Sequence, residues 1–142
     1  MKVLAITILA LALATTAFGR ILTRCSLARE MLDLGVPKDQ LARWTCIALR
    51  ESAYNTTLIY TNTNGSKDYG IFQINDRWWC QPSDGSFSDN ECKIDCVDFL
   101  VDDIAPSVTC SQQILRQQGW TAWHTLKFCN GTLPSIDDCF VC

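Results

Sequence analysis

Glu51 is a carboxylate that the sequence places among apolar side chains. It follows Trp44 by seven residues and Ile47 by four, so a helix would put all three on one stripe. Burial and the negative end of the helix dipole would both raise the pKa of a carboxyl group there. A solvated glutamate at a helix end would more naturally fall on the opposite face, so Glu51 is a candidate proton donor.

Asp68 lies 17 residues later in a polar stretch, where hydrogen-bonding neighbours such as Asn62 and Asn75 could keep a carboxylate ionised. Taken alone, an aspartate beside a turn is ordinary. Paired with a buried acid, however, it fits glycosidic cleavage, which needs a proton donor and an anionic partner. The adjacent Trp78 and Trp79 cannot point the same way, so we expect at least one to be partly exposed and able to stack on sugars.

The sequence predicts two helices ahead of the residues around Asp68. Apolar residues recur at helical spacing over residues 27–34 and stop at Gly35, a typical C-terminal cap. A second helix is predicted to open after Pro37, with Asp39 as its N-cap, and to run to about Ser52. This second helix would carry Glu51 in its last turn.

The middle of the chain is predicted to form a small antiparallel sheet. Residues 58–61 and 67–74 are rich in β-branched and aromatic side chains, and Asn64-Gly65 between them is a strong hairpin signal, since both turn residues must tolerate positive φ. A third helix is expected after a cysteine-rich loop, with Asp103 as its cap. The expected fold class is therefore α+β.

The composition indicates one globular domain. The chain has 142 residues, 19% of them charged, and neither a repeat nor a linker divides residues 20–142. The net charge of −3 and a pI of about 5.0 argue against nucleic acid or an anionic membrane as partner. Nine cysteines at this density indicate disulfides.

Residues 1–19 are interpreted as a secretory signal peptide. A basic Lys2 precedes a short apolar stretch over residues 3–14, and small residues stand before an expected cleavage site at Arg20. The stretch is shorter than the roughly 20 residues that a membrane-spanning helix needs. We therefore expect a secreted protein, and loss of Lys2 would change its net charge from −3 to −4.

At these residues the sequence resembles the c-type lysozymes, and the similarity covers essentially all of residues 20–140. It rests on three motifs, which are Arg24-Cys25-Ser26-Leu27-Ala28, Trp44-Thr45-Cys46-Ile47-Ala48 with Glu51-Ser52, and the run Asn64-Gly65-Ser66-Lys67-Asp68-Tyr69-Gly70-Ile71-Phe72-Gln73-Ile74-Asn75. Two shorter motifs, Trp78-Trp79-Cys80 and Cys92-x3-Cys96, extend it. The stretch Gln117-Gln118-Gly119-Trp120 and the C-terminal segment Leu133-Pro134-Ser135-Ile136-Asp137-Asp138-Cys139-Phe140 look like the insect branch.

The resemblance implies a lysozyme-like fold, in which a cleft separates a helical subdomain from a small β-hairpin sheet. It also implies a muramidase that hydrolyses the β-1,4 bond between N-acetylmuramic acid and N-acetylglucosamine in peptidoglycan with retention of configuration. Glu51 would be the general acid and then the base, and Asp68 the nucleophile or stabilising charge. Seven further positions match sugar-binding cleft residues, namely Asn62, Gln73, Asn75, Trp78, Trp79, Ala122 and Trp123, of which Trp123 would desolvate the acid.

The resemblance further implies four disulfides. They are Cys25–Cys139, Cys46–Cys129, Cys80–Cys96 and Cys92–Cys110. Eight cysteines can pair in 105 ways, so the sequence alone does not give this pairing. Cys142 is left over, and it could be free, cross-link two otherwise monomeric molecules, or displace Cys139.

The main alternative is a non-catalytic sugar-binding or α-lactalbumin-like calcium-binding protein on the same fold. Both carboxylates of the catalytic pair are present here, whereas calcium-loop positions read Val101, Pro106 and Ser107. We therefore expect no metal and no cofactor. The single histidine, His124, is expected to be a surface or half-buried ring without a chemical role.

The negative net charge of the chain also bears on the pH at which such an enzyme would work. A net negative chain lacks the attraction of a basic enzyme to anionic cell walls at neutral pH. Below about pH 5 its carboxylates begin to protonate and that repulsion falls. The sequence therefore predicts a digestive enzyme with an acidic pH optimum, acting in a gut lumen, rather than a basic antibacterial one.

Overall fold

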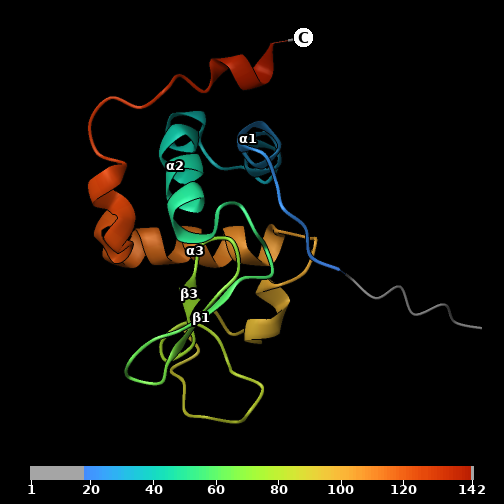
Figure 1. Ribbon diagram of the computed structural model, residues 1–142, viewed down its shortest axis with the longest axis vertical. Helices are drawn as coiled ribbons and strands as arrows, with labels where there is room; N and C mark the ends of the chain where they lie inside the picture. Colours follow the sequence, from blue (N-terminus) through green and yellow to red (C-terminus); the bar gives the residue numbers. More distant parts are fainter. Residues whose placement is uncertain (1–17, 142) are drawn as a thin grey trace, which may run out of the picture.

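The computed structural model describes residues 18–141, which form a helical part and a small sheet. The α-helices are α1 (Arg24–Asp33), α2 (Leu41–Ser52) and α3 (Ala105–Gln118). The strands are β1 (Ile59–Thr61), β2 (Lys67–Tyr69) and β3 (Ile74–Asn75). Figure 1 shows α1 and α2 side by side above α3, with the sheet and its long loop below, so the predicted α+β fold is confirmed.

Helix α1 begins and ends as local sequence rules predict. The Thr23 side chain accepts a hydrogen bond from the Ser26 backbone N–H, and the Ser26 hydroxyl accepts one from the Thr23 N–H, which forms a capping box. After the helix, Gly35 adopts a φ of +87°, a conformation that glycine enters without steric cost. The predicted glycine end is therefore confirmed.

The expected cap of α2 is wrong. Asp39 lies within a 3-10 turn (Lys38–Gln40), and α2 starts at Leu41 behind a residue that is already helical, without a side-chain cap. The chain enters this turn from extended Pro37, so no extended residue is left next to the helix to act as a cap. The helix does run to Ser52, as predicted.

The sheet differs from its prediction in the second strand. The expected strand over residues 67–74 is two strands, because the chain turns between β2 and β3, with Gly70 at φ +74° and Gln73 at φ +51°. The order is β1-β2-β3, all antiparallel. At the hairpin Gly65 alone of the Asn-Gly pair has positive φ, and the Asn62 N–H donates to the Ser66 carbonyl, which closes a three-residue loop.

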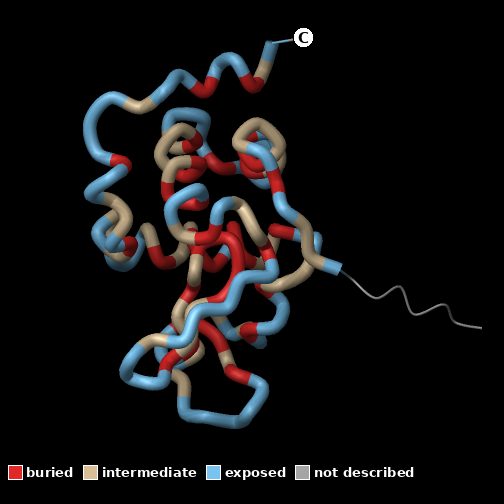
Figure 2. The backbone as a smooth tube through the Cα atoms, viewed as in Figure 1, coloured by how far each residue is buried: buried red, intermediate tan, exposed pale blue. Residues whose placement is uncertain are grey.

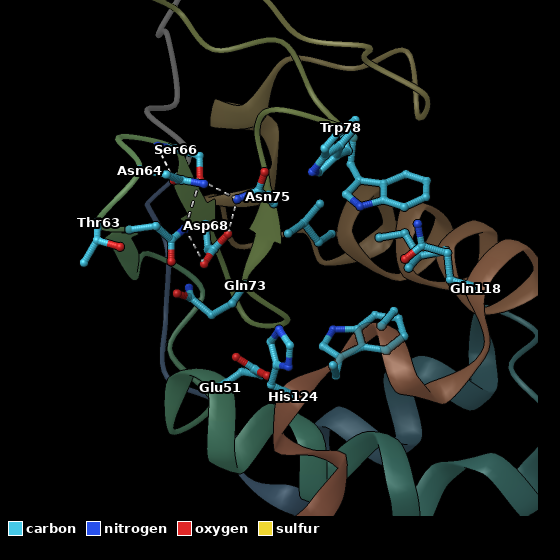
Figure 3. A pocket seen from close by; sticks show the side chains of 16 residues that line it. Glu51, Thr63, Asn64, Ser66, Asp68, Gln73, Asn75, Trp78, Gln118 and His124 are labelled. Carbon is cyan, nitrogen blue, oxygen red and sulfur yellow. Dashed lines mark hydrogen bonds between the residues drawn. The ribbon is translucent and has the colours of Figure 1, made fainter.

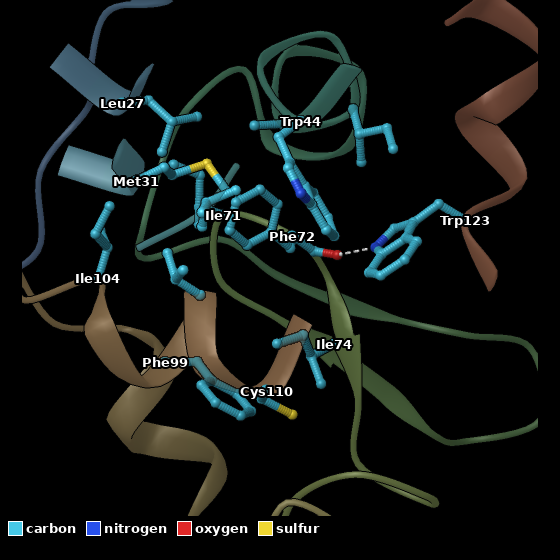
Figure 4. Close-up of a cluster of buried hydrophobic side chains, with 14 of the residues drawn as sticks. Leu27, Met31, Trp44, Ile71, Phe72, Ile74, Phe99, Ile104, Cys110 and Trp123 are labelled. Carbon is cyan, nitrogen blue, oxygen red and sulfur yellow. Dashed lines mark hydrogen bonds between the residues drawn. The ribbon is translucent and has the colours of Figure 1, made fainter. Parts of the chain in front are cut away.

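The core lies where the helices meet the segment between β2 and β3. Trp44 of α2 is fully buried and packs edge-on against Phe72 and Trp123, with ring centroids 5.1 and 4.9 Å apart. Figure 4 shows these rings together, and Figure 2 shows buried backbone concentrated at this junction. Ile71 and Phe72 are completely buried, so the turn that breaks the expected strand anchors the sheet to the helices.

Four disulfides complete the fold, with the pairing that the resemblance implies. They are Cys25–Cys139, Cys46–Cys129, Cys80–Cys96 and Cys92–Cys110. The first two tie α1 and α2 to the C-terminal part of the chain across 114 and 83 residues, which restricts the unfolded chain. Cys142 and residues 1–17 of the expected signal peptide lie outside the described residues.

Asp102 and Asp103 both have partners of their own. Asp102 forms an ion pair with Arg20, and the Asp103 carboxylate accepts a hydrogen bond from the Ala105 N–H at 2.9 Å. The prediction of Asp103 as the N-cap of α3 is wrong by one residue, because the N-cap is Ile104, which is already helical and has no side-chain cap, and Asp103 forms a turn just before it. Within residues 18–141, none of the helices is long and apolar enough to cross a membrane.

Candidate active site

A cleft of about 630 Å³ opens between the sheet and the helical part. All nine residues proposed above as catalytic or sugar-binding line it, namely Glu51, Asn62, Asp68, Gln73, Asn75, Trp78, Trp79, Ala122 and Trp123. Figure 3 shows Asp68 and Asn75 on the sheet side and Glu51 on the helical side. The fold thus brings two carboxylates from separate elements to one cavity.

Glu51 stands in the last turn of α2, half-buried. Burial is the main influence on its carboxyl group and raises its pKa. The Thr125 hydroxyl donates a hydrogen bond to Glu51 Oε1 at 2.7 Å, which favours the ionised form and lowers that pKa. Burial prevails, and repulsion from Asp68 adds to it, so Glu51 holds its proton to a higher pH than an ordinary glutamate.

Trp123 is a buried part of the wall that holds Glu51. Its indole N–H donates to the Phe72 carbonyl at 3.1 Å, a buried bond that joins the helical part to the segment after β2. Ser52 makes a second link, because its hydroxyl donates to the Ile71 carbonyl at 2.8 Å. These two bonds fix Glu51, next to Ser52 in sequence, relative to the opposite wall.

Asp68 is held by amides rather than by burial among apolar groups. Asn62 Nδ2 donates to Asp68 Oδ2 at 3.0 Å, and Asn75 Nδ2 donates to Asp68 Oδ1 at 2.7 Å. Both amides also donate to the Ser66 hydroxyl, at 3.2 and 3.0 Å. Strand register makes this possible, since Asp68 pairs with Asn75 across β2 and β3. Each carboxylate oxygen thus has its own donor, which orients the group and matches its negative charge.

The loop around Asn64 completes this network. Asn64 Oδ1 accepts hydrogen bonds from the Ser66 N–H at 3.0 Å and the Ser66 hydroxyl at 2.7 Å, so the hydroxyl is fixed from both sides. Gln73 is fixed too, because its Nε2 donates to the carbonyls of Gly70 and Leu58 at 2.8 and 3.1 Å. The polar wall is therefore organised before any sugar binds.

The two adjacent tryptophans behave as expected. Trp78 is 52% exposed, whereas Trp79 is 6% exposed and belongs to the core. Figure 3 shows Trp78 at the upper end of the cleft. An exposed indole beside polar side chains can stack on the apolar face of a sugar ring while the polar groups bind its hydroxyls.

Several cleft residues were not anticipated as functional from the sequence. They include Thr63, Ser66, Gln118 and His124 in the lining, and Thr125 as the donor to Glu51. Thr125 and His124 open a 3-10 helix (His124–Phe128) more than 70 residues after Glu51. Neither periodicity nor turn composition relates such a short element to Glu51. The expected exposure of His124 is confirmed, but its place in the cleft was not foreseen.

Potential metal-ligand side chains gather elsewhere in the described part of the chain. Ligand atoms of Cys25, Asp138 and Cys139 lie within 4.8 Å of one another. Both sulfurs are already joined in a disulfide, and Asp138 forms an ion pair with Arg24. This donor set does not suit a metal ion, because the disulfide sulfurs cannot act as thiolate ligands.

Two carboxylates with different surroundings across a cleft can perform acid-assisted displacement at an acetal carbon. A carboxyl group that keeps its proton can protonate a leaving oxygen. A hydrogen-bonded carboxylate opposite can attack or stabilise the positively charged sugar ring. The amides and the exposed indole nearby suit an oligosaccharide, whose rings present apolar faces and polar edges.

Comparisons with known proteins agree with this geometry. Residues 20–139 match the C-type lysozyme/alpha-lactalbumin family. The chain is 67% identical to Lysozyme 2 of Lucilia sericata, over 96% of this chain and 98% of the relative, and 60% identical to Lysozyme 1 of Musca domestica, over 99% and 100%.

A solved structure resembles the fold itself. Recombinant canine milk lysozyme in its apo form superposes with a TM-score of 0.73 at 39% identity, covering 80% of this chain and 92% of that one. The fly relatives and the family match identify the enzyme class, as the resemblance of the motifs implied. The chain is a lysozyme, a glycoside hydrolase, and it belongs to the C-type lysozyme/alpha-lactalbumin family.

Proposed function

We propose that Glu51 and Asp68 are the catalytic pair of a secreted muramidase with a retaining mechanism. Glu51 protonates the leaving glycosidic oxygen, while Asp68 acts as nucleophile or stabilises the cationic sugar ring. Glu51 then accepts a proton from the water that completes hydrolysis. The observation that carries the proposal is the contrast across one cleft, with a Glu51 pKa raised by burial facing an Asp68 held by two amides.

The substrate proposed is the β-1,4-linked chain of N-acetylmuramic acid and N-acetylglucosamine in peptidoglycan. The cleft is polar along the sheet side and carries Trp78 at one end, which suits consecutive sugar rings. Asn62, Gln73 and Asn75 supply polar contacts there, and Trp79, Ala122 and Trp123 belong to the apolar part of the lining. Residues 20–142 would act as a single secreted domain after removal of residues 1–19.

A finer proposal is a digestive role with an acidic pH optimum. The negative net charge of the chain disfavours approach to anionic cell walls at neutral pH, and acid weakens that repulsion. The Thr125 hydroxyl also lowers the pKa of Glu51 and so limits how far burial can extend activity upward. Both features favour activity below pH 7, as in a gut lumen that receives bacteria.

The test is clearance of bacterial cell walls between pH 4 and pH 8 by the wild type and Glu51→Gln. We expect the wild type to clear walls fastest at acidic pH and Glu51→Gln to lose about 100- to 10,000-fold, the usual contribution of a general acid. Equal clearance by both proteins would refute the role of Glu51. A wild-type optimum at pH 7 or above that persists in high salt would refute the acidic optimum alone.

A further inference from the structure

His124 is the single histidine of the chain, and it borders the proposed catalytic acid. It is the first residue of the 3-10 helix His124–Phe128, is exposed, and lines the cleft. In Figure 3 its imidazole stands beside the Glu51 side chain on the helical side. A side chain that can carry a positive charge therefore shares the cavity with Glu51.

The charged groups around His124 come from α2, from β2 and from its own 3-10 helix. Among the described cleft residues, the titratable partners of His124 are Glu51 from α2 and Asp68 from β2. The ammonium of Lys127 and the guanidinium of Arg50 lie 5.0 and 5.2 Å from the Phe128 ring instead. The adjoining 3-10 helix (Trp120–Ala122) consists of residues that do not titrate.

An imidazolium beside a carboxylate favours the ionised carboxylate. His124 accordingly lowers the pKa of Glu51, in the same direction as the Thr125 hydroxyl and against the effect of burial. The reaction uses Glu51 in both forms, protonated as acid and ionised as base. A nearby positive charge thus assists the step in which ionised Glu51 accepts a proton from water. It also lowers the highest pH at which Glu51 is still protonated and can act as the acid.

We propose that His124 is a positioning residue of the reaction, whose imidazolium promotes ionisation of Glu51 and so ends activity at a lower pH than burial alone would. The inference rests on the proposed role of Glu51 as the acid.

The experiment compares pH profiles of kcat/KM on soluble peptidoglycan fragments at constant 0.15 M ionic strength, the approximate physiological value. In His124→Gln we expect the alkaline limb to move to higher pH. An exposed charge pair couples by about 0.2–1 kcal/mol, so activity on that limb relative to the plateau should rise about 1.5- to 5-fold. His124→Lys retains a positive charge and should restore the wild-type limb, which a loss of shape alone would not allow.

Lys127→Gln is the matched control, because it removes one positive charge from the same 3-10 helix at a residue that lies against Phe128. It should leave the alkaline limb in place. An unmoved limb in His124→Gln, an equal shift in Lys127→Gln, or a failure of His124→Lys to restore the limb would each overturn the proposal.

Titration of the Glu51 carboxyl carbon by NMR in the wild type and in His124→Gln gives a second readout. The Glu51 pKa should be higher in His124→Gln than in the wild type, and an unchanged pKa would contradict the proposal. The experiments distinguish failure of the proposed role of Glu51 from failure of the proposed role of His124. Full activity of Glu51→Gln refutes the catalytic role of Glu51, whereas an inactive Glu51→Gln with an unmoved limb in His124→Gln refutes only the role of His124.

Discussion

The two walls of the cleft control their carboxylates by different physical means. On the helical wall, Glu51 lies half-buried in the last turn of α2 and receives one hydroxyl hydrogen bond, from Thr125. On the sheet wall, Asp68 has a separate amide donor on each oxygen. The first arrangement makes ionisation costly, while the second provides for a fixed negative charge. Unlike walls are what give two similar carboxylates distinct roles.

The largest expected effect separates those roles directly. Glu51→Gln should lose about 100- to 10,000-fold on the natural linkage, because the leaving oxygen is no longer protonated. A glycosyl fluoride substrate, whose leaving group needs no proton, should restore bond cleavage in Glu51→Gln. Asp68→Asn should lose comparable activity on both substrates, since its charge is needed however the leaving group departs. Fluoride release measures this step, and rescue of Asp68→Asn would reverse the assignment.

A smaller effect is expected when the amide network on the sheet wall is broken. Asn75→Ala removes the 2.7 Å donor to Asp68 and leaves the Ser66 hydroxyl with fewer partners. A hydrogen bond to a charged group is worth about 1.5–3 kcal/mol, so kcat/KM should fall about 10- to 100-fold. Asn130→Ala, at an exposed asparagine outside the cleft lining, is the control. Unchanged kinetics in Asn75→Ala would show that the network does not support catalysis.

The helical wall predicts a shift of the pH profile. Thr125→Val keeps the approximate shape of the side chain but removes the donor that lowers the pKa of Glu51. The pKa of Glu51 should rise, and the alkaline limb of kcat/KM should move to higher pH with a similar plateau. Thr125→Ser retains the hydroxyl and should keep the wild-type profile. The same shift in Thr125→Ser would attribute the effect to packing instead of the hydrogen bond.

The same contrast explains which parts of the site the sequence could predict. Helical spacing identified Glu51, and Asp68 lies with its asparagines in one continuous run of sequence. Local patterns and the family motif were therefore enough to predict both residues. Thr125 and His124 come from a short 3-10 helix, which has no periodicity to identify the residue it will contact. Their roles depend on how distant segments pack together.

The fold shows a similar division. The α2 stripe and the end of α1 at Gly35 follow local rules, and the structure confirms them. The turn at Gly70 and Gln73 did not follow from composition, because its residues favour strands and only burial of Ile71 and Phe72 in the core explains the break. Tertiary packing overrides strand propensity at that point.

The smallest expected effect concerns stability. Because burial raises the pKa of Glu51 above its value in the unfolded chain, the folded state binds that proton more tightly. The folded protein is therefore penalised as pH rises from the unfolded pKa through the folded one, while below both values the group contributes no difference. Glu51→Gln removes this penalty, so its melting temperature should exceed that of the wild type at pH 7 but not at pH 3.

Glu91→Gln, which replaces an exposed glutamate, serves as the matched control and should show no comparable gain at pH 7. A gain in Glu51→Gln of the same size at both pH values would mean that the amide simply packs better. A gain in melting temperature that appears only at the pH where the carboxyl group ionises would show that the folded protein keeps Glu51 at a cost in stability. Such a cost is expected where a functional group is held in unfavourable surroundings.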